Sequence, residues 1–191
     1  MIDPIYPTLS RKVPTGREWR YELKLDGFRG VLYVENGRGE FRSKTSRSMP
    51  RFQDLAEGIA RALRLRSAIF DGEIVVLRNR RHDFASLMYR RGRPEYAAFD
   101  LLWLDGRDLR DLPYVERKRL LKKVTSRSKA IGYVENHRRP ELFEAAARLD
   151  LEGIVAKRVT DPYTAATLWV KIKNRAYSQN VGRWEMFKRR R

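Results

Sequence analysis

Residues 19–26 alternate apolar and charged side chains, which is the pattern of a strand with one buried and one polar face. On the polar face, Lys24 stands between two carboxylates, Glu22 and Asp26, each two residues away. Gly27 follows, and a glycine here allows the backbone to turn or to approach a ligand closely. The segment therefore predicts a strand that presents a lysine near its end, just before a turn.

Two interpretations of Lys24 follow from this pattern. A lysine amine is a nucleophile only after it loses its proton, and its reference pKa is roughly 10.4. A site that uses such an amine must supply desolvation or nearby positive charge to favour the neutral form. The alternative is a half-exposed strand whose lysine pairs with its acidic neighbours. The segment alone does not separate the two.

Four further blocks extend the pattern along the chain. Residues 22–29 read ELKLDGFR, and the blocks that follow are FDGE at 70–73, YAAFDLL at 96–102, EGIVAKR at 152–158 and WVKIK at 169–173. The set resembles the nucleotidyltransferase motifs of ATP-dependent DNA ligases, in the order of that family. It resembles in particular the adenylation domain of the bacterial end-joining ligase D group. In the first motif, the lysine carries the covalent AMP.

The resemblance implies that Lys24 forms a phosphoramide with the α-phosphate of ATP. Adenylyl transfer needs an in-line nucleophile and cations on the phosphates. Lys171 and Lys173 share one face of a predicted strand, so both ammonium groups can point into one cleft. There they would hold the α-phosphate and, as like charges, favour a neutral amine on Lys24. The alternative for both lysines is a solvated strand face.

Two carboxylates are the expected metal ligands. Glu73 lies on an apolar predicted strand, which is a costly place for a carboxylate unless it is paired or bound. The resemblance implies that Glu73 meets the ribose or a hydrated metal, and that Glu152 helps to bind the divalent cation. Mg²⁺ or Mn²⁺ needs only one or two carboxylates when phosphates and water complete its shell. Structural ion pairs are the alternative for either residue.

The resemblance also implies an adenosine pocket. Phe99 would stack on adenine with Val155 over the opposite face, although Phe99 by itself reads as an ordinary core aromatic. Glu22 would read the adenine amino group. The remaining implied nucleotide contacts are Leu23, then Arg29, which meets the ribose or later the 5′-phosphate, and Lys157, which faces phosphate.

The charge balance favours a phosphate polymer as partner. Lys plus Arg number 42 against 24 for Asp plus Glu, which gives a formal charge of +18. We expect nicked or broken DNA to bind, with contacts from Arg42, Lys44, Arg183, Lys188 and Arg189. Lys44 follows Ser43 where relatives usually carry arginine, and lysine keeps the charge but loses the bidentate fork.

The composition excludes several other chemistries. The chain has no cysteine, so it can form no disulfide or thiolate metal site, which agrees with a reducing bacterial cytosol. No apolar run approaches the ~20 residues of a membrane span, and the first residues do not read as a secretory signal. His82 and His137 stand in no metal-ligand spacing and read as surface residues.

Periodicity and turn signals predict an α+β fold, with antiparallel sheets flanked by helices. The resemblance implies the nucleotidyltransferase fold of DNA ligases and mRNA-capping enzymes, which is ATP-grasp-like. Helices are expected after Pro50, after Pro113 and over about residues 140–149, the last with Leu149 inward. Mobile basic loops are expected at residues 43–49 and 78–93. Strands are expected at residues 19–25, 30–34, 40–42, 68–77, 96–104, 153–157 and 168–172.

A single nucleotidyltransferase domain over residues 1–191 is expected, with a basic tail from about residue 175. Only 18 residues follow Lys173, too few for the five strands of the OB domain that ligases of this family normally carry. The domain could be free-standing, or excised from a longer protein. Our hypothesis is that Arg183 and residues 188–191 lie along phosphate, anchored by Trp184 and Phe187; the alternative is a solvated terminus.

The expected function is that of a monomeric ATP-dependent DNA ligase in DNA repair. Three alternatives stay open. RNA ligases and cap-forming guanylyltransferases share Lys24 and Gly27, although Asp26 and Arg29 favour a DNA ligase. The chain could instead self-adenylylate and seal only with a separate OB-fold or repair protein. It could also be a non-catalytic DNA-binding module, which intact protein mass with and without ATP would reveal.

Overall fold

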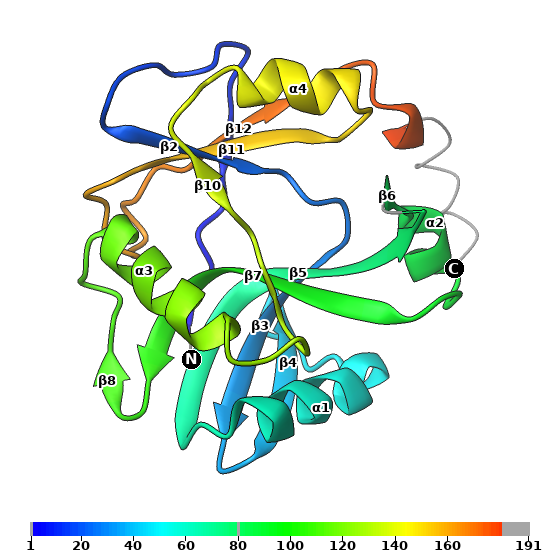
Figure 1. Cartoon of the computed structure of the whole chain (residues 1–191), viewed down its shortest axis with the longest axis vertical. Coiled ribbons are helices and arrows are strands. Elements are labelled where there is room, and N and C mark those ends of the chain that lie inside the picture. Colours follow the sequence, from blue (N-terminus) through cyan, green and yellow to red (C-terminus); the bar gives the residue numbers. More distant parts are fainter. Residues whose placement is uncertain (1, 80, 181–191) are drawn as a thin grey trace.

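Residues 2–79 and 81–180 are described by the structure, a computed structural model in which two sheets lie one above the other (Figure 1). The smaller sheet has the strand order β1 (Thr8–Leu9), β12 (Val170–Lys173), β11 (Gly153–Arg158), β2 (Trp19–Leu23) and β10 (Asn136–His137). The larger sheet runs β4 (Arg38–Ser43), β3 (Phe28–Glu35), β5 (Ser67–Arg78), β7 (Pro94–Leu104) and β8 (Arg107–Asp108), with β6 (Arg81–His82) beside β5 and β9 (Gly132–Tyr133) beside β7.

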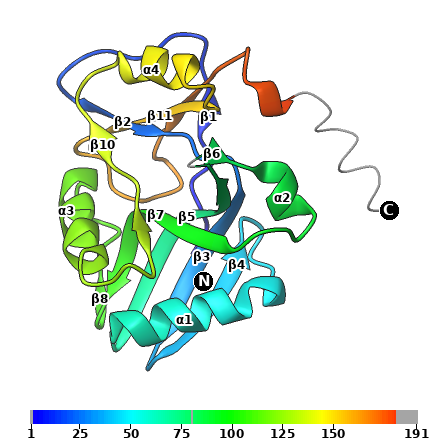
Figure 2. The same ribbon diagram turned by 45° about the vertical axis from the view of Figure 1, so that its right-hand side comes forward.

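Helices cover the outer faces of the two sheets. Figure 2 shows α4 and α1 at opposite ends of the molecule, with both sheets between them. The helical segments are η1 (Pro50–Phe52), α1 (Gln53–Leu63), α2 (Phe84–Met88), α3 (Tyr114–Thr125), α4 (Leu142–Arg148) and η2 (Ser178–Asn180). Strands β1 and β12 pair in parallel, as do β7 and β9, and the other described strand pairs are antiparallel. The expected α+β class is confirmed.

Turn dipeptides, which are a local sequence signal for a hairpin, stand at two of the observed hairpins. Asn36 and Gly37 have φ of 48° and 79° and join β3 to β4. Asp105 and Gly106 have φ of 47° and 95° and join β7 to β8. Asn, Asp and Gly adopt this left-handed region most readily, which is why these dipeptides predict tight turns.

Residues 78–93 depart from the expected loop. Strand β5 continues to Arg78, and α2 follows β6 because Asp83 caps it: the Asp83 side chain accepts from the Ser86 N–H at 2.8 Å. Phe84 and Leu87 are buried on the inner side of α2, so the short apolar face outweighs the flanking arginines. His82, in β6, is half-buried rather than a surface residue, whereas His137 is exposed as expected.

Two smaller boundaries also differ from expectation. Strand β2 ends at Leu23 rather than residue 25, although the Lys24 N–H still donates to the Gly153 carbonyl at 2.9 Å. Helix α4 ends at Arg148, and Leu149 beyond it is 60% exposed rather than inward. Ala146 supplies the buried contact of this helix instead.

The N-terminal arm ties the two sheets together. The Ile2 N–H donates to the hydroxyl of Tyr33 in β3 at 3.0 Å, and the Ile5 N–H donates to the Tyr163 hydroxyl at 3.3 Å. Strand β1 then joins the smaller sheet beside β12. Ile2 and Ile5 pack in a buried cluster that includes Leu102, Tyr163 and Trp169. The arm therefore crosses from one sheet to the other beside the candidate site.

Arg183, Lys188 and Arg189 lie outside the described residues, as do Trp184 and Phe187. The hypothesis that this tail follows phosphate therefore stays a prediction. Among residues 2–79 and 81–180, no helix has both the length and the hydropathy to cross a membrane.

Candidate active site

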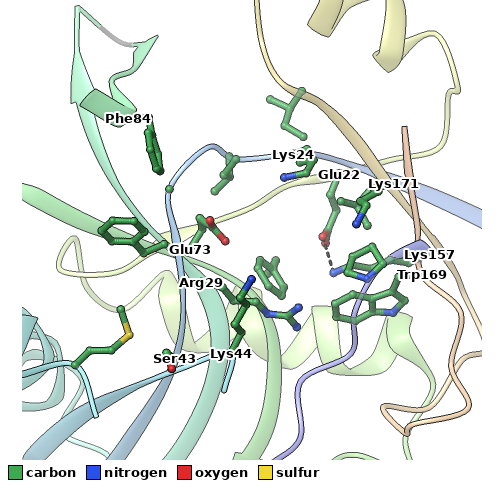
Figure 3. A pocket seen from close by; sticks show the side chains of 18 residues that line it. Glu22, Lys24, Arg29, Ser43, Lys44, Glu73, Phe84, Lys157, Trp169 and Lys171 are labelled. Atoms are coloured by element: carbon green, nitrogen blue, oxygen red, sulfur yellow. Dashed lines mark ion pairs between the residues drawn. The ribbon is translucent and has the colours of Figure 1, made fainter. Parts of the chain in front are cut away.

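A cavity of about 520 Å³ lies between the two sheets (Figure 3). Strands of both sheets supply its walls, and all five sequence blocks contribute. The lining residues from these blocks include Glu22, Leu23, Lys24, Arg29, Glu73, Phe99, Val155, Lys157, Trp169 and Lys171. Residues that lie as much as 149 positions apart in sequence, from Glu22 to Lys171, therefore meet in one space. The cavity has two chemically different ends.

A carboxylate holds the candidate nucleophile at one end. Lys24 Nζ donates to Glu152 Oε2 at 2.7 Å, and Lys173 Nζ lies 3.6 Å from Glu152 Oε1. Glu152 is 4% exposed and Lys24 is 23% exposed, so the lysine retains access to the cavity. The predicted metal ligand Glu152 thus carries two ammonium partners from within the chain.

Lys171 brings a third ammonium group to this end. The β11–β12 register sets Gly153 opposite Lys173 and Val155 opposite Lys171, which places both lysines on the same strand face as predicted. Lys171 lines the cavity, whereas Lys173 is not among the lining residues and is 44% exposed. Burial lowers the pKa of Lys171, and the charges of Lys24 and Lys173 lower it further.

Glu22 occupies the other end, where it is buried and held by several donors. The Tyr114 hydroxyl donates to Glu22 Oε1 at 2.7 Å, and Lys118 Nζ lies 2.8 Å from the same oxygen. Lys157 Nζ lies 2.6 Å from Glu22 Oε2, the ion pair drawn as a dashed line in Figure 3. Lys157 Nζ has no partner of hydrogen-bond geometry among the described residues, so it keeps N–H donors for another acceptor.

Lys157 lies among aromatic rings rather than beside Lys24 and Lys171. Its Nζ is 3.9 Å from the centroid of the Trp169 ring and 4.6 Å from that of Phe99. Cation–π attraction of this kind stabilises a buried ammonium. The resemblance had implied that Lys157 faces phosphate, but its ammonium is paired with Glu22, next to the aromatic rings.

Phe99 and Val155 are partly buried and line the cavity, and Trp169 meets Phe99 edge to face with centroids 5.9 Å apart. Phe99 is therefore not a fully buried core aromatic. Part of its surface faces the cavity, as stacking on a ligand requires. Trp169 lies in one of the sequence blocks, but its wall position was not predicted.

Arg29 is already paired with other groups of the protein. Its Nε donates to Asp71 Oδ1 at 2.9 Å, its Nη2 pairs with Asp71 Oδ2, and its Nη1 donates to the Ile5 carbonyl. Tyr163 completes the cluster by donating to Asp71 Oδ2 at 2.6 Å. A contact from Arg29 to ribose or phosphate must share the guanidinium with Asp71. The sequence signal for Asp71 was its place on an apolar strand, the same signal that singled out Glu73.

Glu73 lies across from Arg29 in the β3–β5 ladder and faces the cavity half-buried. Burial raises the pKa of Glu73 to about 8, and the positive charges of Lys24 and Arg29 oppose that rise. The described residues hold no group of three or more His, Cys, Asp or Glu side chains that could bind a metal by themselves. A metal here would need ligands from phosphate or water in addition to Glu73 and Glu152.

Of the two predicted DNA contacts near the cavity, only one lines it. Lys44 is exposed and lines the cavity mouth, where its carbonyl accepts from the Tyr6 hydroxyl at 2.6 Å. Arg42 does not line the cavity; its guanidinium lies 5.5 Å from the Tyr33 ring centroid and 3.3 Å from Glu40. Phe84 of α2, which the sequence did not single out, supplies an apolar wall (Figure 3).

Helix α3 contributes two residues that the sequence reading missed. Tyr114 and Lys118 both reach Glu22, and both lie on the buried face of the helix. The signal was available, because the buried positions Tyr114, Arg117, Lys118, Leu121 and Thr125 recur at helical spacing and include two charges. Burial lowers the pKa of Lys118, although the Glu22 charge acts in the opposite direction.

A sequence model described as "ATP dependent DNA ligase domain" matches residues 6–173, which is most of the chain. The chain belongs to the ATP-dependent DNA ligase family. The multifunctional non-homologous end joining protein LigD of Pseudomonas aeruginosa is 34% identical over 187 residues, covering 90% of this ligase chain and 22% of that protein. The bifunctional LigD of Bacillus subtilis is 30% identical over 209 residues, covering 91% of this chain and 34% of that protein. This ligase chain thus spans about a fifth to a third of these relatives.

Solved structures of DNA ligases share the fold. Mycobacterial DNA ligase D complexed with ATP and MES matches with a TM-score of 0.77 and 28% identity, covering 89% of this chain and 59% of that one. The Chlorella virus DNA ligase-adenylate matches with a TM-score of 0.60 at 14% identity, covering 90% of this chain and 68% of that one, a likeness of fold alone. The nucleotidyltransferase fold expected for a DNA ligase is confirmed.

Proposed function

We propose that this domain catalyses adenylyl transfer from ATP to DNA by way of Lys24. The observation that carries the proposal is the position of Lys24 Nζ at the cavity, 2.7 Å from Glu152 and on the same side as Lys171. A lysine among further cations, next to one buried carboxylate, suits attack on a phosphate. The other end of the same cavity, which is lined by Glu22 and Phe99, supports a nucleotide as donor.

The proposed reaction has three steps. Lys24 Nζ forms a P–N bond to the α-phosphorus of ATP, the bond to the bridging oxygen breaks, and pyrophosphate leaves with that electron pair. Glu152 Oε2, at 2.7 Å, is positioned to receive the proton that Lys24 must lose. A DNA 5′-phosphate oxygen then displaces Lys24 from the AMP phosphorus. The DNA 3′-hydroxyl finally attacks the activated 5′-phosphorus, which releases AMP and closes the backbone.

Lys171 and Lys173 would hold the α-phosphate from the β12 side. Mg²⁺ or Mn²⁺ would fit this end, because Glu73 lines the cavity and the buried Glu152 pairs with Lys24 beside it, and such ions accept phosphate and water for the rest of their shell. A bound cation would neutralise phosphate charge and favour departure of pyrophosphate. Glu73 and Glu152 would hold it, which requires Glu152 to exchange a lysine partner for the metal.

The base end suits adenine. Glu22 offers a carboxylate acceptor, and Lys157 beside it offers free N–H donors. Adenine presents a 6-amino donor next to the N1 acceptor, so the two patterns are complementary. Phe99 and Val155 line the same end and would cover the faces of the base, with Leu23 beside them. Arg29 would reach the ribose while still paired with Asp71.

We further propose that the partner is nicked or broken DNA in the bacterial cytosol. The formal charge of +18 favours phosphate contacts, and Lys44 at the cavity mouth is placed for a 5′-phosphate. Relatives named as non-homologous end joining proteins support a role in joining broken ends. A separate OB-fold or repair protein would assist the sealing step, and we propose that the domain itself acts as a monomer.

The test is intact protein mass after incubation with ATP and Mg²⁺. The wild type should gain one AMP, Lys24→Ala should gain none, and Lys129→Ala, an exposed lysine away from the cavity, should label as the wild type does. A wild type of unchanged mass would leave a non-catalytic DNA-binding module as the better account. Full labelling of Lys24→Ala would mean that another residue is the nucleophile.

A further inference from the structure

Lys118 is a charged side chain that lies behind the cavity rather than in it. It projects from the inward face of α3, its side chain is 2% exposed, and it is not among the lining residues. A buried ammonium destabilises the fold unless acceptors surround it. The partners of Lys118 therefore identify the part of the site that depends on this charge.

Those partners belong to the base end of the cavity. Lys118 Nζ lies 2.8 Å from Glu22 Oε1, and it donates to the Phe99 carbonyl at 3.3 Å and to the Val134 carbonyl. The ring of Tyr133 lies below it, with the centroid 4.3 Å from Nζ. One ammonium thus fixes both the carboxylate at the base edge and the backbone of the aromatic that lines the base pocket.

The arrangement leaves Glu22 able to act only as an acceptor. Tyr114 and Lys118 approach Oε1, and Lys157 approaches Oε2. Tyr114 donates to the carboxylate and the two ammonium groups pair with it as positive charges, so the carboxylate offers the cavity a lone pair and no proton. An exocyclic amine on a bound base is a partner for that lone pair. A carbonyl at the same position would set two acceptors against each other.

We propose that Lys118 is a positioning residue that sets the nucleobase preference of the site through Glu22. The inference rests on the proposed adenylyl transfer and adds a residue that touches no substrate. Without the Lys118 ammonium, Glu22 loses one of its two charged partners and the Phe99 carbonyl loses its donor. The carboxylate then has freedom to turn from the base edge, and discrimination between a 6-amino and a 6-oxo purine falls.

A merely structural role for Lys118 makes a different prediction. If the lysine only balanced a buried charge, its loss would lower labelling with every nucleotide by the same factor. A positioning role changes the ratio between nucleotides. ATP and ITP are the suitable pair, because ITP replaces the 6-amino group and the N1 acceptor by a carbonyl and an N–H and leaves the triphosphate unchanged.

The experiment measures kcat/KM for lysine labelling with ATP and with ITP in wild type, Lys118→Met and Lys122→Met. Lys122 is the matched control, since it lies one turn further along α3, is 65% exposed and pairs with Glu135 at 3.4 Å. Methionine keeps most of the length of lysine and removes the charge. We expect the ATP:ITP ratio to fall about tenfold in Lys118→Met, the value of one hydrogen bond to a charged group, and to stay unchanged in Lys122→Met.

A second pair of variants keeps the test valid if Lys118→Met folds poorly with Glu22 left short of a partner. Glu22→Gln removes the charge of the carboxylate, and Glu22→Gln/Lys118→Met removes the charges of both the carboxylate and the ammonium. The double variant therefore leaves fewer buried charges without a partner than Lys118→Met alone. If Lys118 acts through Glu22, the ATP:ITP ratio should be the same in these two variants. Melting temperatures verify that each compared protein is folded.

Two results would overturn the inference while the wild type labels normally. One is an equal loss of ATP and ITP labelling in folded Lys118→Met, with the ratio unchanged. The other is a further fall of the ratio when Lys118→Met is added to Glu22→Gln. A wild type that takes AMP from neither nucleotide would instead refute the proposed function, and the inference with it.

Discussion

Lys24 Nζ and Glu152 Oε2 lie 2.7 Å apart, in an ion pair whose carboxylate is almost fully buried. The candidate nucleophile therefore lies within hydrogen-bond distance of a carboxylate. The two residues are 128 positions apart in sequence, and they meet at one end of the β2–β11 ladder, where Lys24 follows β2 and Glu152 precedes β11. In the proposed mechanism, this pairing would make Glu152 part of the first chemical step, in addition to any contact with a metal.

Replacement of Glu152 by glutamine should abolish most labelling of Lys24 and spare the fold. Gln has the size of Glu and its carbonyl can still accept from Lys24, but it cannot take a proton. We expect the rate of self-adenylylation to fall about 10²-fold or more, in the range of general acid–base effects. Single-turnover labelling and a melting curve measure the two quantities. Glu144→Gln, an exposed change on α4, is the control, and an unfolded Glu152→Gln would mean that the carboxylate is structural.

Glu73 should make stability fall as pH rises between about 5 and 8. Burial raises the pKa of Glu73 to about 8 in the folded protein from its ordinary value of 4.5. The folded state then binds more protons than the unfolded state between these values, so the free energy of unfolding decreases with pH in that window. Urea unfolding in EDTA at several pH values gives the free energy of unfolding as a function of pH. The slope of that free energy against pH should be smaller for Glu73→Gln than for the wild type. Identical slopes would remove Glu73 as the cause.

Asp71→Asn should destabilise the protein far more than the same change at Asp108. Asp71 is fully buried, pairs with Arg29 through two contacts and accepts from Tyr163, so its loss leaves a buried guanidinium without a countercharge. We expect a loss of about 3–5 kcal/mol in the free energy of unfolding. Asp108 also pairs with an arginine, Arg110, but at the surface, where about 0–1 kcal/mol is typical. Urea titration of both variants tests this, and equal losses would contradict it.

DNA binding should be mainly electrostatic and nearly independent of sequence. With a formal charge of +18, the plot of log K against log salt should be steep for any duplex. Lys44→Ala should lower that slope by about one unit, because it removes one phosphate contact, whereas Lys129→Ala should not. Fluorescence anisotropy at several salt concentrations gives the slopes. A flat response in the wild type would rule out this mode of binding.

The sequence predicted the order of the motifs, the hairpins and the strand that leads to Lys24, because period-two alternation and turn dipeptides are local signals. It also predicted the shared face of Lys171 and Lys173. These features need only the direction of side chains along one strand. The family resemblance supplied the convergence of distant blocks, which local patterns do not contain.

The sequence reading missed the partners that depend on packing between elements. Lys118 reaches Glu22 from a helix 92 or more residues away in sequence, and nothing local to either residue specifies the pair. Lys157 was placed beside phosphate because its motif does not reveal that Trp169 and Glu22 surround its ammonium. Residues 78–93 read as a loop because five arginines among residues 78–91 masked the short apolar face of α2.

The N-terminal arm has a consequence for the order in which the protein folds. Thr8 pairs with Val170, and the Ile5 N–H donates to a hydroxyl 158 residues further along the chain. Contacts of such sequence separation form late, since most of the chain must be made and folded before both partners exist. During synthesis from the amino terminus, the arm stays without its strand partner until β12 has emerged. The arm can therefore take its place in the cavity wall only after the last of the five sequence blocks has been synthesised.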